Sequence, residues 1–171
     1  MRSVTTTYAY DAAGELTSAG SVSYAYDANG SRTSRTAGAT TTYTWNSDNL
    51  LAATSSPSLT TSYVYDGENQ RVAASENGVT TDFVLDVTAA DELVLQETTG
   101  EEVTTYTFGA ELGTPDLTGS RFRFTGQWAD AAGLTFLRAR FTDPETGTFL
   151  SVDPVPSSCL LYTSPSPRDR G

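Results

Sequence analysis

The stretch YAYDANG at residues 24–30 is one copy of a motif that recurs through this 171-residue chain. It places two aromatics one residue apart, follows them directly with Asp, and ends with Gly three positions after the Asp. Successive copies begin 16 to 23 residues apart, and a repeat of this length is one supersecondary unit that must stack on its neighbours. Clear copies lie at residues 8–14, 43–49 and 63–69, and fainter ones at 83–86 and 106–109.

Each copy predicts a β-hairpin. Residues i and i+2 of a strand project from one face, so Tyr24 and Tyr26 stand side by side while Ala25 faces the other way. The Asp27 carboxylate is suited to bonding backbone amides ahead of it in a type I turn. Gly30 tolerates the positive φ that closes a hairpin with a bulge. Each motif is therefore expected to form a strand, a tight turn and a return strand.

The segments between the motifs favour strands as well. They are rich in β-branched Thr, which suits pleated, half-solvated strands, and no stretch shows a convincing 3.6-residue period. Around residues 89–96, where Asp91 and Glu92 interrupt the strand pattern, a turn is expected rather than a helix. The sequence predicts an all-β fold in which consecutive antiparallel hairpins over residues 1–119 form an open, curved strip.

Composition narrows the classes of function. The chain has 10 basic residues against 21 acidic ones, a net charge of −11, and no His. Nucleic acid and anionic lipid are poor partners for such a chain. No apolar run reaches the length of a membrane span. Without His, most zinc sites and His-based triads are excluded, so no metal or cofactor is expected.

The two ends of the sequence suggest a piece of a longer protein. The first ten residues lack the order of a signal peptide. After Pro156 the composition changes, and residues 157–171 hold the only Cys, Cys159. Residues 159–169 resemble the conceptual translation of a sequencing-library adaptor, as in a metagenomic reading frame that ran into it. This tail is expected to be non-native and disordered, although a natural Ser/Pro linker is the alternative.

Residues 120–156 carry the most specific pattern of the chain. The segment contains FRFTGQ at residues 122–127, RARF at 138–141 followed by Asp143 and Pro144, and GTFLS at 147–151 followed by Asp153 and Pro154. The repeats resemble the YD repeats of bacterial Rhs and wall-associated proteins. The segment 120–156 resembles the Rhs repeat-associated core motif. Together the two resemblances cover nearly all of residues 1–154.

The resemblance implies a role in enclosure. In that family the strip winds into a hollow container that holds a C-terminal toxin or effector used in bacterial competition. The expected partners are therefore the remaining repeats and that cargo domain, and the expected location is the cell surface or the exterior. The chain itself is expected not to be an enzyme.

The core segment is expected to form three strands and two turns. Asp130 to Gly133 repeats the turn chemistry of the repeats, and Pro144 and Gly147 suit a second turn. Between the turns, one strand is expected to place Phe136, Arg138 and Arg140 on one face. The other arginines of this segment, Arg121, Arg123 and Arg138, are expected to balance carboxylates of neighbouring repeats, with an anion site as the alternative.

Arg140 and Asp153 are the candidate catalytic residues. Rhs cores resemble one another in that they cleave themselves by an aspartic mechanism. Two carboxylates share a proton, and an arginine stabilises the remaining negative charge. By motif position, Arg140 and Asp153 would be the core's contribution. The second aspartate and the cleavage point are expected beyond residue 154, so this fragment is an incomplete self-cleaving core. Asp143 is explained as a turn former.

The aromatic ladder suggests another function. Rows of exposed Tyr and Trp bind sugars, because each ring offers a flat apolar face and a polar group. Such rows also join neighbouring strands, and packing is the favoured interpretation. The alternative is a cell-surface module that binds glycans, with these stacking candidates: Tyr10, Tyr26, Trp45 and Tyr65.

Overall fold

The computed structural model describes residues 6–86, 88, 93–106, 128–137 and 140–153, and these residues form only strands and turns. The predicted all-β fold is thereby confirmed. Nowhere in these ranges is there a helix long and apolar enough to cross a membrane. The predicted strand around Arg121 and Arg123, the turn at residues 89–92 and the tail at 157–171 lie outside the described residues.

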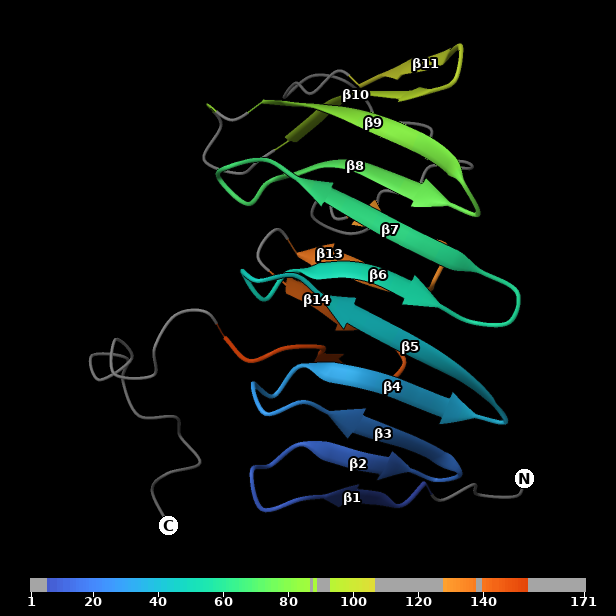
Figure 1. The fold of residues 1–171 in the computed structure, drawn as a ribbon, viewed down its shortest axis with the longest axis vertical. Coiled ribbons are helices and arrows are strands. Elements are labelled where there is room, and N and C mark those ends of the chain that lie inside the picture. The colour runs from blue at the N-terminus through green and yellow to red at the C-terminus, as the bar shows by residue number, and fades with distance from the viewer. Residues whose placement is uncertain (1–5, 87, 89–92, 107–127, 138–139, 154–171) are drawn as a thin grey trace, which may run out of the picture.

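The repeats form one antiparallel sheet whose strands follow each other in sequence order (Figure 1). Its eleven strands run from β1 at one edge to β11 at the other, so the sheet is open, as predicted. The turn expected around residues 89–96 is wrong for Leu93 to Gln96, which belong to β10, because these residues pair with β9. The strands are β1 (Tyr8–Tyr10), β2 (Leu16–Ala19), β3 (Val22–Tyr26), β4 (Arg32–Ala37), β5 (Ala39–Trp45), β6 (Leu51–Ser55), β7 (Thr60–Tyr65), β8 (Arg71–Glu76), β9 (Val79–Asp86), β10 (Leu93–Thr99) and β11 (Glu102–Thr105).

Each repeat turn is built as the motif predicts. In the first, Oδ1 of Asp11 accepts hydrogen bonds from the backbone N–H of Ala13 at 2.8 Å and of Glu15 at 2.9 Å. Gly14 closes the turn with φ of 83°. The same pair of bonds recurs at Asp27, Asn46 and Asp66. In Figure 1 these turns lie along one side of the sheet.

A β-bulge accompanies every one of these turns. The strand register shifts just before the second aromatic, for example between Ala25 and Tyr26. Tyr24 is buried, Ala25 is exposed and Tyr26 is half-buried, and the third and fourth repeats follow the same order. The predicted hairpin with a bulge, and the sorting of the paired aromatics to one face, are therefore confirmed.

The core motif folds into a separate four-stranded antiparallel sheet. One expectation for it is wrong. Leu137 and Arg140 are antiparallel partners, so the chain reverses between them, and Phe136 pairs with Phe141 instead of sharing a strand with Arg140. The alternating pattern hid this reversal because no Gly, Asn or Asp marks it. The strands are β12 (Trp128–Ala129), β13 (Thr135–Leu137), β14 (Arg140–Asp143) and β15 (Thr148–Phe149).

The small sheet covers one face of the large one, and the apolar core lies between them. Tyr63 packs on Phe141 with ring centroids 4.9 Å apart, and Phe83 meets Trp128 edge to face at 5.4 Å. In Figure 1, β13 and β14 lie behind the middle strands of the large sheet. The sequence did not predict this second layer. The core cluster consists of Tyr43, Leu51, Tyr63, Ala74 and Phe83 from the large sheet and Trp128, Leu134, Phe136, Phe141 and Leu150 from the other.

Neighbouring repeats are joined by a hydrogen bond that the second aromatic makes. The hydroxyl of Tyr65 donates to the carbonyl oxygen of Leu51 at 2.8 Å, five residues after the Asn that opens the preceding turn. The same position in the second and third repeats is bonded in the same way. Tyr26 donates to the carbonyl of Leu16 at 3.1 Å, and Nε1 of Trp45 donates to the carbonyl of Arg32 at 2.8 Å.

Removing one of these hydroxyls tests the bond between repeats. We expect Tyr65→Phe to lower the free energy of unfolding by about 1 kcal/mol, because the ring remains and one buried hydrogen bond is lost. Urea denaturation followed by fluorescence measures the change. The control is Tyr8→Phe, which removes a hydroxyl from an exposed ring and should change stability by less than about 0.5 kcal/mol. Equal effects of the two substitutions would contradict the role given to the Tyr65 hydroxyl.

A buried ion pair also links the two layers. Arg32 on β4 is fully buried and donates to Asp143 on β14 at 2.9 Å and to the hydroxyl of Thr148 at 3.0 Å. The Arg32 backbone N–H donates to the carbonyl of Leu150 at 2.7 Å. Its guanidinium also lies 4.5 Å from the centre of the Tyr24 ring. Arg32 therefore fixes where the small sheet sits on the strip.

Breaking this pair is expected to be costly. Arg32→Met should lower the free energy of unfolding by about 3–5 kcal/mol, because it leaves the Asp143 carboxylate buried without its counter-charge. The double variant Arg32→Met with Asp143→Leu should recover much of that loss. Arg35→Met breaks the more exposed pair with Glu145 and should cost about 1 kcal/mol or less. A double variant as unstable as the single one would contradict this account of the interface.

Candidate functional site

The structure brings the two candidate catalytic residues together. The Arg140 guanidinium lies 3.0 Å from an Asp153 carboxylate oxygen, and the side chains are 19% and 46% exposed. The guanidinium also stacks on the Phe149 ring, 3.7 Å from its centre. The arginine is therefore held between an aromatic face and a carboxylate, at the surface of the core sheet.

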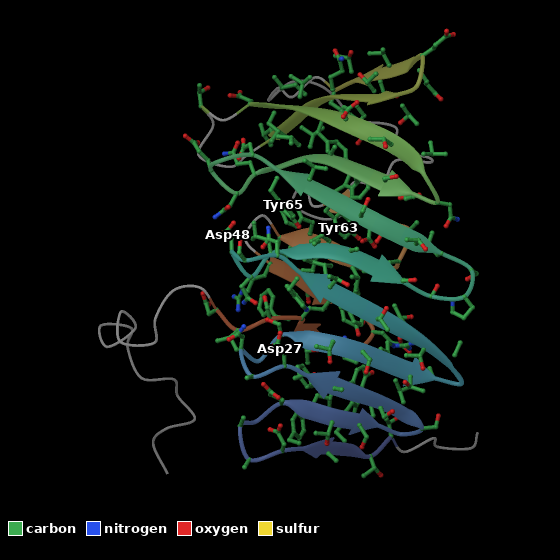
Figure 2. The ribbon with its side chains drawn as sticks, in the orientation of Figure 1. Asp27, Asp48, Tyr63 and Tyr65 are labelled. Carbon is green, nitrogen blue, oxygen red and sulfur yellow. The ribbon has the colours of Figure 1, made fainter. Side chains whose placement is uncertain are left out.

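Two repeat turns complete the surroundings of Arg140. A cleft of about 130 Å³ is lined by Arg140 and Ser151 from the core and by Asp48, Asn49 and Asn69 from the turns of the third and fourth repeats. Figure 2 shows Asp48 at the end of the hairpin formed by β5 and β6. Asn49 and Asn69 close their turns with φ of 59° and 65°. The amide oxygen of Asn49 accepts a hydrogen bond from the hydroxyl of Ser31 at 2.7 Å.

These repeat residues were missed by reasoning from the sequence. Asp48, Asn49 and Asn69 read as ordinary turn residues, and nothing in their local pattern points to the core motif. The chemistry that the cleft supports is charge compensation, since Arg140 balances and positions the Asp153 carboxylate. A two-carboxylate mechanism also needs an acid that keeps its proton. Asp48 is the carboxylate that the repeats add to this cleft.

Asp143 has a structural part in the fold. Its Oδ1 accepts a hydrogen bond from the backbone N–H of Glu145 at 2.9 Å, as a residue that opens a turn does. Its other oxygen pairs with the buried Arg32. The turn role follows from the sequence, whereas the ion pair joins residues 111 positions apart and has no local signal.

The four candidates for sugar stacking do not share one surface. Tyr26, Trp45 and Tyr65 are half-buried, and the polar group of each donates to a backbone carbonyl of the preceding repeat. Burial raises the pKa of the Tyr65 hydroxyl. Only Tyr10, of these four, is largely exposed, at 59%. This placement favours packing between repeats over an extended row of binding rings.

A buried polar chain crosses the interface between the layers. The hydroxyls of Thr54 and Thr61 lie 2.8 Å apart, and Thr61 donates to the Tyr63 hydroxyl at 3.0 Å. Tyr63 in turn donates to the Asp130 carboxylate. Figure 2 places Tyr63 in the middle of the large sheet. Asp130 was predicted as a turn residue, and it does accept from the backbone N–H of Leu134 at 2.8 Å.

Burial has a clear electrostatic effect on this chain of hydroxyls. Desolvation raises the pKa of Asp130 above the ordinary 3.8, against the opposing effects of the Tyr63 hydroxyl, the Leu134 amide and the nearby Arg71. Desolvation, followed by the charge of Asp130, likewise raises the pKa of Tyr63. Arg71 itself lies among rings, 4.3 Å from the centre of Trp128 and 4.4 Å from that of Phe136.

The raised pKa of Asp130 predicts a pH dependence of stability. Below about pH 4 the carboxyl is protonated in both the folded and unfolded states, whereas at higher pH the unfolded state ionises first. The stability that the protonated Asp130 carboxyl contributes is therefore lost as pH rises through its folded-state pKa. We expect the free energy of unfolding to fall between pH 4 and pH 7 more in the native chain than in Asp130→Asn.

The measurement is urea denaturation at several pH values. Asp66→Asn makes the same substitution in an exposed turn of the fourth repeat and should leave the pH profile of the native chain nearly unchanged. If Asp130→Asn leaves the profile unchanged as well, the buried carboxyl is not the source of the pH dependence.

Within the described part of the chain, no group of three or more acidic, Cys or His side chains is arranged to hold a metal ion. The candidate site is thus a cleft of charged and amide side chains.

Comparison with known proteins gives a partial match. The chain is 36% identical over 76 residues to a tRNA(Glu)-specific nuclease WapA from Bacillus subtilis subsp. natto and to a tRNA nuclease WapA from Bacillus subtilis strain 168. Each match covers 40% of this chain and 3% of the relative. No family model matches the chain. At this coarse level the match agrees with the resemblance to wall-associated repeat proteins.

Proposed function

We propose that this chain is a structural, non-enzymatic segment of a bacterial Rhs or YD-repeat shell. In the parent protein the shell encloses a C-terminal toxin or effector that is delivered in competition between cells, at the cell surface or after secretion. The remaining repeats and the cargo are its partners. Both relatives are named as nucleases that act on tRNA. These names support a toxin as the cargo of the parent protein.

The observation that carries this proposal is the hydrogen bond that recurs between successive hairpins. Three successive repeats bond to their predecessors through the same atom position, and each adds two strands to one continuous sheet. A unit that binds its neighbour in the same way each time can be extended by further units. An extended sheet with one covered face is the construction that a container wall requires.

Protease protection of the cargo in the parent protein tests this function. An enclosed cargo should resist a protease that rapidly digests the same domain expressed alone. Arg32→Met in the parent should speed digestion, because it loosens the small sheet on the wall, whereas Arg35→Met should not. Cargo that is digested as fast in the intact parent as in isolation would rule out enclosure.

A second candidate function is favoured by the contact between Arg140 and Asp153. It is self-cleavage of the parent protein by an aspartic mechanism, with Asp153 as one carboxylate and Arg140 as the residue that holds its charge. The second carboxylate and the cleaved bond would lie after this segment. The described cleft supplies only part of that machinery.

Mass spectrometry separates the two candidates. We expect this chain to keep its full mass of 18.2 kDa during incubation. We expect the parent protein to be cut after the core, and Asp153→Asn to abolish the cut. Asp66→Asn, which makes the same change in an exposed turn outside this cleft, serves as the matched control and should leave the cut intact. Cleavage of this isolated chain that depends on Asp153 would show that it is itself an enzyme.

A further inference from the structure

A second, larger depression adjoins the cleft beside Arg140, and Ser151 and Val152 line both of them. It has a volume of about 440 Å³, which is within the range of small-ligand sites. Its walls come from the turns of the first two repeats and from the end of the core motif. Three rings contribute, those of Tyr10, Tyr26 and Phe149, together with the side chains of Glu15 and Val152. We call it the N-terminal groove.

Packing fixes the shape of this groove. The Tyr26 ring is held by the bond from its hydroxyl to the carbonyl of Leu16. Gly30 lies under Val152, and a Cβ atom at Gly30 would come within 2.5 Å of a Val152 methyl and 3.0 Å of a Glu15 oxygen. Glycine at this position therefore lets the core chain pass close over the turn. Its φ of 75° also disfavours any other residue.

The groove combines aromatic faces with uncompensated negative charge. Burial and the neighbouring carboxylates of Asp11 and Asp27 raise the pKa of Glu15. Two arginines lie beside rings of the groove, Arg32 at 6.0 Å from the centre of Tyr26 and Arg140 at 3.7 Å from that of Phe149, and both already have counter-charges. Arg32 pairs with Asp143, and Arg140 pairs with Asp153. A cation supplied from outside would relieve the crowding of carboxylates.

We propose that the N-terminal groove binds an arginine side chain of a basic partner peptide. The guanidinium plane stacks on an aromatic ring and its N–H groups bond the Glu15 carboxylate, which is the combination of contacts that arginine makes best. Phe149 already stacks on a guanidinium, that of Arg140, so the protein uses the same contact internally. The net charge of −11 favours the approach of a basic segment.

Isothermal titration with a short blocked peptide of alternating Gly and Arg tests the proposal. We expect binding that weakens about fivefold in Glu15→Gln and in Tyr10→Leu, the size of effect that one cation–π or charge contact gives. A peptide with citrulline in place of arginine keeps the shape without the charge and should bind far more weakly. Unchanged circular dichroism of the variants shows that they fold.

The matched control is Glu68→Gln, which makes the same charge change in the turn of the fourth repeat, outside the N-terminal groove. It should leave the affinity within about twofold of the native value, as a charge remote from the bound peptide is largely screened by salt. If it weakens binding as much as Glu15→Gln does, the peptide is held by overall charge and the groove is not its site. Equal binding of the citrulline peptide, or of a neutral disaccharide in its place, would also overturn the proposal.

Discussion

The packing of the small sheet against the first aromatic of the third, fourth and fifth repeats is the contact on which the structure depends. An isolated antiparallel sheet exposes both faces to solvent and cannot bury its apolar side chains. Here Tyr43, Tyr63 and Phe83 line one face, and the core motif covers them with Trp128 and Phe141. Residues of the middle repeats and of the core motif therefore form one core. The strip and its cover stabilise each other, because neither has a second layer without its partner.

The cover is located on the strip by charges as well as by rings. Arg32 and Arg71 occupy the same position in the second and fourth repeats, five residues after the residue that opens the turn, and both are buried. Arg32 meets the Asp143 carboxylate, whereas Arg71 lies among aromatic faces. Burying a charged side chain costs free energy. That cost is offset only in an arrangement that places a counter-charge or an aromatic ring beside the buried arginine. We infer that these arginines select one position of the small sheet among those that aromatic packing alone would allow.

The same architecture determines where ligands could reach the protein. The polar groups of Tyr26, Trp45 and Tyr65 join one hairpin to the next. The rings of Tyr24, Tyr43 and Tyr63 are buried, which leaves little of the aromatic ladder for a partner. The polar clefts instead lie where the turns of the repeats meet the end of the core motif. There Arg140, which pairs with Asp153, lines one cleft together with Asp48, and the N-terminal groove opens beside Glu15. A shell built from these repeats would therefore present its ligand-binding side chains along the turns.

The sequence by itself determined the hairpins. Asp or Asn with Gly or Asn three positions later specifies the turn and its positive φ, and alternation sorts the paired aromatics to one face, because both signals act within seven residues. The pairing of Arg140 with Asp153 also followed from the motif, although its roles in chemistry stay a prediction. Tertiary structure alone decided that the core motif folds over the strip, that the chain reverses between Leu137 and Arg140, and that Asp130 and Asp143 become buried. Those outcomes depend on contacts between residues far apart in the sequence, such as Arg32 with Asp143, which are separated by 111 positions. No local pattern encodes which distant surface will supply a counter-charge or a ring.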